Sequence, residues 1–199
     1  MTFIEPAVTG LGVFEVTPAQ TVGPYFASGL PFPEQHHVVA AGTPGAITIT
    51  GTIYDGHGDV IPDHVIEFWQ PDGDGRFADL HGYGEQSELE GFRGFGRWCV
   101  EDGDGSYEMV TVKPGAVSFL NGGATQAPHI DVTVMARGML HRVVTRIYFA
   151  DETQANAADP VLQTVPEPRR GTLLAQPDGD GYRFDIHLQG PHETVFFAI

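Results

Sequence analysis

One pair of residues in this sequence has the types and the spacing for metal chemistry. His129 and Asp131 stand one residue apart in a run of β-branched and apolar residues, which predicts a strand. Because side chains alternate between the two faces of a strand, both polar groups lie on one face, within reach of a common ion. Two protein ligands are few for a metal site, however, and a histidine hydrogen-bonded beside a buried carboxylate is the simpler interpretation. The pattern leaves both interpretations open.

The other residues that could carry chemistry give weaker signals. The remaining histidines stand at expected turns, at strand ends or in the proline-rich beginning of the chain, where solvated side chains are the usual case. Cys99, the only cysteine, has no second thiol and no basic neighbour except Arg97, which favours a buried structural thiol over a nucleophile. The sequence contains no nucleophile elbow, phosphate-binding loop or dinucleotide fingerprint.

Four Asp-Gly segments occur along the chain and have residue types that are also found in calcium-binding loops. The loop that starts at Asp102 carries Tyr107 where an EF-hand needs glycine, and the loop that starts at Asp72 carries Arg76 at a ligand position. The spacing therefore predicts hairpin turns, because aspartate and glycine supply the positive φ angles that such turns require.

The composition excludes several classes of function. The 199 residues suffice for one domain with its own core, and 26 acidic against 10 basic residues give a net charge of −16. Nucleic acid and anionic membranes need clustered cations, so we expect neither as a partner. No stretch approaches the roughly 18 apolar residues of a membrane span. The start lacks a signal-peptide pattern, and a single cysteine fits a reducing compartment, so we expect a cytoplasmic protein.

Short runs with a period of two predict an all-β fold. The segment Ala46–Tyr54 alternates Ile47, Ile49 and Ile53 with threonines, which places one face in a core. Further strands are expected at residues 64–70, 97–101, 107–113, 130–136, 142–149, 182–189 and 194–197. Short helices are expected at residues 152–158, capped by Asp151, and at residues 167–175. Short strands separated by tight turns predict an antiparallel β-sandwich.

The first 45 residues differ from the rest of the chain. They contain six prolines and little periodicity, so we expect an extended N-terminal arm over residues 1–45 that packs on a partner, followed by a β-sandwich domain over residues 46–199. Within the arm, Thr17-Pro-Ala-Gln-Thr-Val-Gly-Pro-Tyr25 predicts a rigid loop. This loop either covers a strand edge or forms a pocket wall whose backbone approaches a ligand at Gly23.

A series of ordered motifs resembles the intradiol ring-cleaving dioxygenases over nearly the whole chain. The matching segments are Thr17-Pro-Ala-Gln-Thr-Val-Gly-Pro-Tyr25, Ile53-Tyr-Asp-Gly56, Glu67-Phe-Trp-Gln70, Val112-Lys-Pro-Gly115, Ala127-Pro-His-Ile130, Ala136-Arg-Gly138, Thr145-Arg-Ile-Tyr-Phe149, Tyr182-Arg-Phe-Asp-Ile186 and Glu193-Thr-Val-Phe-Phe197. The resemblance implies a β-sandwich, a role in the degradation of aromatic compounds, and cleavage of a catechol between its two hydroxyl-bearing carbons. It also implies a non-haem ferric ion held by two tyrosines and two histidines.

The chain departs from this family at the metal positions. An iron-bearing member has a tyrosine after Lys-Pro-Gly-Pro, whereas Val117 follows Lys113-Pro-Gly-Ala here, and His-x-His is replaced by His129 and Asp131. Tyr83 lies in the loop of residues 76–93, which matches the family too poorly to place the other tyrosine. A ferric ion needs anionic oxygen and well-fixed imidazole, which His129 and Asp131 do not rebuild. We therefore expect vestigial metal-site positions, no bound metal and no catalytic residue in this chain alone.

By resemblance, the chain works with an iron-bearing partner. The implied partner is a homologous subunit that holds Fe(III), in a hetero-oligomer that cleaves 3,4-dihydroxybenzoate with O2. The resemblance implies that Thr21, Gly23, Pro24, Tyr25 and Arg137 line a shared substrate pocket. A wall of proline and tyrosine suits the flat ring of the substrate, and the positive arginine offsets the negative charge of the substrate carboxylate.

Two other hypotheses fit parts of the sequence. Composition and turns alone equally support a non-catalytic β-sandwich that binds a small molecule or another protein through its Asp-Gly loops. A self-sufficient dioxygenase that uses His129 and Asp131 is the third hypothesis. Metal analysis of the isolated chain and a search for a homologous partner separate the three.

Overall fold

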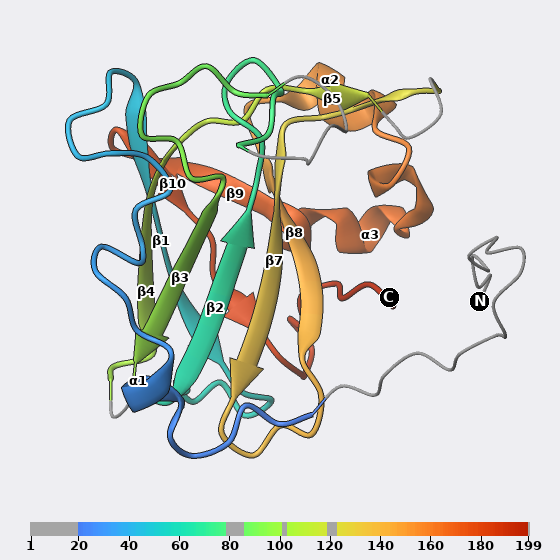
Figure 1. The fold of residues 1–199 in the computed structure, drawn as a ribbon. Helices are drawn as coiled ribbons and strands as arrows, with labels where there is room; N and C mark the ends of the chain where they lie inside the picture. Colours follow the sequence, from blue (N-terminus) through green and yellow to red (C-terminus); the bar gives the residue numbers. More distant parts are fainter. Residues whose placement is uncertain (1–19, 79–85, 101–102, 119–122, 199) are drawn as a thin grey trace, which may run out of the picture.

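Strands dominate the fold of this chain (Figure 1). The computed structural model describes residues 20–78, 86–100, 103–118 and 123–198. The strands are β1 (Ala46–Tyr54), β2 (His64–Trp69), β3 (Phe95–Val100), β4 (Ser106–Val112), β5 (Val117–Ser118), β6 (Thr125–Gln126), β7 (His129–Ala136), β8 (Val143–Phe149), β9 (Leu174–Asp178), β10 (Gly181–Arg183) and β11 (Ile186–His187). The helices are α1 (Phe26–Gly29), α2 (Thr153–Ala158) and α3 (Glu167–Arg170), with 3-10 turns η1 (Leu162–Thr164) and η2 (Gly171–Leu173). None of these helices has the length and hydropathy to cross a membrane.

Apart from the separate β5–β6 pair, the strands form two layers that β9 joins. One layer has the order β3-β2-β7-β8, with antiparallel neighbours throughout, and in the other β1 pairs with β4, β10 and β11. The first two residues of β9, Leu174 and Ala175, run parallel to β8, whereas residues 176–178 pair antiparallel with β10. A single strand thus closes one side of the sandwich.

The core lies between these two layers. Ile49 and Ile53 of β1 face Phe68, Val132 and Ile147 of the other layer, and all five side chains are buried. Polar or half-buried residues alternate with buried ones along β1 and β7, as the period of two predicts. The burial that stabilises the fold therefore comes from the same side chains whose spacing identified the strands.

The predicted β-sandwich is confirmed, with a mixed rather than purely antiparallel sheet. The pairings β1–β10, β1–β11 and β8–β9 are parallel. The β8–β9 pairing arises because the chain leaves β8 through α2 and α3 and returns on β9, which is the long crossover that a parallel pairing needs. Glycines of all four Asp-Gly segments have positive φ, at Gly58, Gly75, Gly105 and Gly179. The expectation of hairpin turns holds only in part: residues 178–181 join β9 to its antiparallel neighbour β10, whereas β1 and β2, and β3 and β4, lie in different layers.

Two expectations near the C-terminus are wrong. Residues 194–197 form no strand, although the N–H groups of Thr194 and Phe197 still donate to the carbonyls of His187 and Val144. The helix expected at residues 167–175 ends at Arg170, and a 3-10 turn then leads into β9. Pairing with β8 and β10 overrides the local helix preference of this segment.

The expected cap of α2 is also wrong. Asp151 does not cap the helix, whose N-cap residue Glu152 makes no side-chain capping bond. The Asp151 carboxylate instead accepts from Nζ of Lys113 at 2.8 Å and from the Tyr182 hydroxyl at 3.0 Å. The side chain thus ties the end of β8 to the opposite layer.

The described part of the first 45 residues runs along the same sandwich. Val38 lies in the core, its N–H donates to the Val110 carbonyl at 2.8 Å, and the Val110 N–H donates to the His36 carbonyl at 2.9 Å. The Arg97 N–H donates to the Gln35 carbonyl at 2.6 Å. Residues 35–38 therefore cover β3 and β4, and contact of residues 1–45 with a partner stays a prediction.

Candidate functional site

His129 and Asp131 lie on one face of β7, and each has a cross-strand partner on β8. His129 stands opposite Tyr148, and Asp131 stands opposite Arg146. Because directly opposite residues of an antiparallel pair share a face, the four side chains form one group. The group lies at the start of β7, at the upper end of the sheet in Figure 1.

Arg146 supplies the positive charge of this group. Its Nε donates to Oδ1 of Asp131 at 2.8 Å, and its Nη1 donates to Oε1 of Gln126 at 2.8 Å and to the Tyr148 hydroxyl at 3.4 Å. Burial by itself lowers the pKa of Arg146, but the Asp131 carboxylate, Tyr148 and Asp159 together more than offset this, so the pKa is raised. The guanidinium therefore stays charged and occupies Oδ1 of Asp131, an oxygen that a metal ion would otherwise use.

The hydrogen bonds continue from Tyr148 to a fully buried carboxylate. Oδ1 of Asp159 accepts from the Tyr148 hydroxyl at 3.1 Å and from the N–H groups of Val161 and Leu162 at 2.9 and 2.7 Å. Its Oδ2 accepts from the Ala127 N–H at 2.8 Å. Because Asp159 directly follows α2, this carboxylate fixes the α2–η1 segment to the start of β7.

Burial sets the protonation of the two rings in this group. Burial, and then the positive charge of Arg146, lowers the pKa of His129, so the imidazole is neutral at pH 7. Its Nδ1 lies 2.7 Å from the Ala127 carbonyl, which assigns the proton to Nδ1. Burial also raises the pKa of Tyr148, whose phenol therefore keeps the proton that it donates to Asp159.

The residues at this end of β7 do not fit a ferric ion. Val117 is buried on β5, where it pairs with Gln126, and it offers no ligand atom. Asp131 is paired with Arg146, and Tyr148 is a neutral phenol. Across the described ranges, no three His, Cys, Asp or Glu residues lie close enough together to hold a metal ion. Tyr83 lies outside the described residues.

Arg137 lies just beyond the opposite end of β7. Its Nη2 forms an ion pair with Oδ2 of Asp63, the residue that precedes β2, and its N–H points to the Asp63 carbonyl at 3.4 Å. The Asp63 side chain is 5% exposed, whereas the Arg137 side chain is 59% exposed. The guanidinium is therefore anchored on one side by a buried carboxylate and open to solvent on the other.

The segment that carries Thr21, Gly23, Pro24 and Tyr25 lies at this same end of the sheet. Thr21 and Pro24 are exposed, and 80% of Tyr25 is exposed. Gly23 has a φ of +81°, and a Cβ added there meets no atom of this chain within 4 Å. The left-handed backbone explains the glycine, and the open space around it leaves room for another molecule. Residues 17–19 of this motif lie outside the described residues.

The helix α1 fixes this segment to the sheet. Phe26 of α1 is buried, and its carbonyl accepts from Sγ of Cys99 at 3.6 Å. Cys99 lies opposite Val65 at the start of β2, and His64 of β2 lies opposite Ala136 at the end of β7. Figure 1 shows α1 at the lower end of the sheet, near the start of β2. The structure thus brings the Thr21–Tyr25 loop and Arg137 to one end of the sandwich.

The length of β7 separates the two groups of predicted site residues. His129 begins the strand and Ala136 ends it. Seven steps of about 3.4 Å make a separation of roughly 24 Å. No substrate the size of a single ring spans that distance. Arg137 and the Thr21–Tyr25 loop therefore do not form one site with His129 and Asp131.

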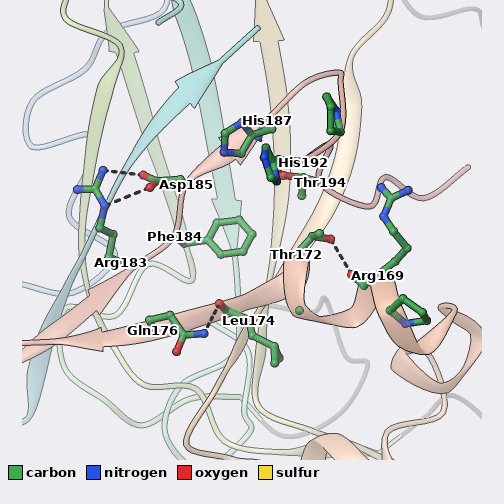
Figure 2. Close-up of a pocket in the computed structure, with 13 residues that line it drawn as sticks. Arg169, Thr172, Leu174, Gln176, Arg183, Phe184, Asp185, His187, His192 and Thr194 are labelled. Atoms are coloured by element: carbon green, nitrogen blue, oxygen red, sulfur yellow. Dashed lines mark hydrogen bonds and ion pairs between the residues drawn. The ribbon is translucent and has the colours of Figure 1, made fainter. Parts of the chain in front are cut away.

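A separate hollow of about 430 Å³ lies beside α3, β10 and β11 (Figure 2). The two arginines that line it make hydrogen bonds within the chain. Arg183 donates to Asp185 at 2.7 Å, and Arg169 donates to the Glu193 carbonyl at 2.7 Å. His187 and His192 lie on its upper side in Figure 2, with ring centroids 5.9 Å apart. None of the residues that the sequence singled out as site residues lines this hollow.

Comparison with known proteins agrees with the fold and with the motif series. A sequence model of the family described as dioxygenase matches residues 21–190. The chain belongs to this family. It is 44% identical to the protocatechuate 3,4-dioxygenase alpha chain of Burkholderia cepacia, across 92% of this chain and 97% of that one. It is 31% identical to the beta chain of the same organism's enzyme, across 74% of this chain and 66% of that one.

Solved structures of the dioxygenase family share the architecture. The dioxygenase domain of a dioxygenase carbohydrate-binding protein fusion from Streptomyces sp. SirexAA-E superposes with a TM-score of 0.52 at 26% identity, covering 88% of this chain and 99% of that chain. The intradiol ring-cleaving dioxygenases that the sequence resembles are therefore the relatives of this chain by sequence and by fold.

Sequence reasoning missed the side chains that surround His129 and Asp131. Arg146 and Tyr148 share a face of β8 by the period of two, and this signal could have paired them with β7. Asp159 and Gln126 carry no comparable pattern, because neither sits in a regular alternation. The sequence pattern also does not predict the role of Asp63, since nothing in Pro62-Asp63 indicates a buried carboxylate.

Proposed function

We propose that this chain is the metal-free alpha subunit of a protocatechuate 3,4-dioxygenase. The observation that carries the proposal is the contrast between the two ends of β7. At one end Arg146 is paired with Asp131, and at the other the exposed Arg137 lies at the same end of the sheet as the exposed Tyr25. Residues suited to an aromatic acid thus lie far from the chain's own vestigial metal-site positions, which favours a site completed by another subunit.

The proposed reaction is the cleavage of protocatechuate by O2. The bond between the two hydroxyl-bearing carbons of 3,4-dihydroxybenzoate breaks, and each new carboxyl group of 3-carboxy-cis,cis-muconate takes one oxygen atom from O2. The reaction belongs to the β-ketoadipate route of aromatic-compound catabolism. In this reaction the alpha subunit binds and orients the substrate, and the reaction with O2 takes place on the partner subunit.

Each residue of the shared pocket has a distinct task in this proposal. Arg137 donates hydrogen bonds to the substrate carboxylate, and such a charge-assisted bond contributes more than a neutral one. Pro24 and Tyr25 form a wall against the ring. Thr21 and Gly23 shape the loop, with Gly23 allowing close approach of the backbone because it has no side chain.

The proposed partner is the homologous beta subunit, which carries Fe(III). The dioxygenase family depends on iron, and the vestigial metal-site positions of this chain do not fit a ferric ion. When bound in the partner, the iron supplies the redox chemistry that joins the catechol to O2. The alpha–beta naming of the relatives supports this pairing.

Expression of the chain alone and with its partner tests the proposal. Purified alone, the chain should hold no iron and cleave no 3,4-dihydroxybenzoate, as measured by metal analysis and by oxygen uptake. Purified with a beta chain that has all four iron ligands, it should form a complex that carries iron and cleaves the substrate. Stoichiometric ferric iron in the lone chain would overturn the assignment, and failure to associate with any beta chain would favour a separate binding module.

A further inference from the structure

A buried carboxylate lies directly behind the exposed arginine of the proposed pocket. Asp63 precedes β2, and Arg137 follows β7, two strands that pair as His64 opposite Ala136. The antiparallel register therefore brings residues 63 and 137 to facing positions one step beyond the sheet. The carboxylate of Asp63 forms an ion pair with Nη2 of Arg137, and the Asp63 carbonyl faces the Arg137 N–H at 3.4 Å.

The two partners of this ion pair differ sharply in exposure. The side chain of Asp63 is 5% exposed and that of Arg137 is 59% exposed. A buried carboxylate has lost its hydration and must be satisfied by protein groups. The geometry of its ion pair with Arg137 is therefore strongly constrained. A guanidinium has five N–H donors in a planar fork, so one edge can hold Asp63 while the others face outward.

We propose that Asp63 is a positioning residue for Arg137 in the shared substrate pocket. This inference rests on the proposed function. An unanchored arginine loses much side-chain freedom when it binds a carboxylate, and the Asp63 ion pair removes part of that loss in advance. Asp63 also compensates the charge of Arg137, so that recognition depends on directed hydrogen bonds more than on long-range attraction.

The test uses the assembled complex of this chain with its iron-bearing partner. The central variant is Asp63→Asn, which keeps the shape and removes the charge, and it is compared with Arg137→Gln and with the double variant. The matched control is Asp185→Asn, because Asp185 also holds an arginine, Arg183, but in the other layer of the sandwich. Far-UV circular dichroism and size-exclusion chromatography check folding and assembly of every variant.

The decisive readout separates carboxylate recognition from ring recognition. Two competitive ligands, 4-hydroxybenzoate and 4-hydroxybenzamide, share the ring and differ in the charged group. Asp63→Asn should weaken inhibition by 4-hydroxybenzoate about 3- to 10-fold and raise KM for 3,4-dihydroxybenzoate to a similar extent, with kcat little changed. Inhibition by 4-hydroxybenzamide should stay the same, and Asp185→Asn should leave both ligands unaffected.

Coupling between the two residues distinguishes positioning from a general loss of structure. If Asp63 acts through Arg137, the double variant should be no weaker than Arg137→Gln alone. Should Asp63→Asn fail to assemble, Asp63→Glu replaces it: the charge is kept but the guanidinium is displaced, so weaker binding of 4-hydroxybenzoate is again expected.

The outcomes also separate this inference from the proposed function. If Arg137→Gln weakens binding of 4-hydroxybenzoate but no Asp63 variant does, the positioning role is wrong and the shared pocket stands. If Arg137→Gln changes nothing, both the pocket role of Arg137 and the role of Asp63 fail. Equal weakening of the acid and the amide by Asp63→Asn also overturns positioning, because it points to a distorted pocket.

Discussion

The two ends of β7 carry charged side chains in opposite arrangements. At the start of the strand, the side chains of Asp131 and Arg146 are both more than half-buried, and their hydrogen-bond partners belong to the same chain. Beyond its end, Arg137 is held by Asp63 but presents most of its side chain to solvent. The end that carries the predicted metal-site residues is thus closed, and the end that carries Arg137 is open.

This difference shows that side chains of the types that ligate metals can be satisfied within the chain. An arginine between a carboxylate and a phenol satisfies the same acceptors as a cation, without any need for a metal ion. The Asp159 carboxylate then extends the network to α2. Under the proposed function, the start of β7 serves stability and the other end of the strand serves recognition of the substrate.

The largest expected effect is on stability at the closed end. Asp159→Ala leaves the N–H groups of Ala127, Val161 and Leu162 and the Tyr148 hydroxyl without their acceptor. The free energy of unfolding should fall by about 3–5 kcal/mol, the range for removing one member of a buried charged network. Urea unfolding of the isolated chain measures it.

The control for this substitution is Asp180→Ala, at an exposed turn. It should change the free energy of unfolding by less than about 0.5 kcal/mol. A loss below about 1 kcal/mol for Asp159→Ala would contradict the view that this carboxylate holds the network together.

At the open end, Arg137→Ala should act on binding. A charged hydrogen bond contributes roughly 1.5–3 kcal/mol, so the apparent affinity of the assembled enzyme for 3,4-dihydroxybenzoate should fall about 10- to 100-fold. The free energy of unfolding should fall as well, because the buried Asp63 carboxylate loses the guanidinium that pairs with it. Steady-state kinetics of the complex measure the effect, and unchanged kinetics would remove Arg137 from the pocket.

Asp131→Ala should act on stability and not on turnover. Turnover of the assembled enzyme should stay nearly intact, whereas the free energy of unfolding should fall by about 1–2 kcal/mol, between the values of exposed and buried ion pairs. The loss arises because Arg146 keeps its charge but loses the carboxylate at 2.8 Å. Abolished turnover in a correctly assembled complex would mean that this end is not idle.

The smallest expected effect is a dependence of stability on pH that involves both ends. Burial is the main cause that lowers the pKa of His64, beside Asp63, and of His129 below their ordinary value of 6.5. Below pH 6.5 the unfolded chain then binds more protons than the folded chain. The free energy of unfolding should therefore be at its full value above pH 6.5 and fall as the pH drops toward the lower, folded-state pKa values.

Chemical unfolding between pH 7.5 and about 5 measures this slope. His129→Gln should flatten it by removing one of the histidines with a lowered pKa, which include His36, and His57→Gln, at an exposed turn, controls for the substitution itself. A slope that His129→Gln leaves unchanged would assign the pH dependence to other groups.

Much of the fold could be predicted because the strands are amphipathic. The isoleucines of Ala46–Tyr54 predicted β1 to the residue, and the aspartate–glycine turns have the expected positive φ angles. The segment at residues 174–178 was assigned partly to a helix, because its strand character comes from its neighbours β8 and β10. Residues 194–197 look like a strand in sequence, yet they form no regular ladder.

By itself, the sequence determined which residues lie on the same face of a strand and which ligand types are missing. The valine at position 117 and the aspartate at position 131 are enough to argue against a ferric site, because neither can act as the tyrosine or histidine of the family. Only the tertiary structure decided that Arg146 pairs with Asp131 and that Asp63 pairs with Arg137. Those partners are set by the register between strands, which depends on packing across the whole sheet and not on local spacing.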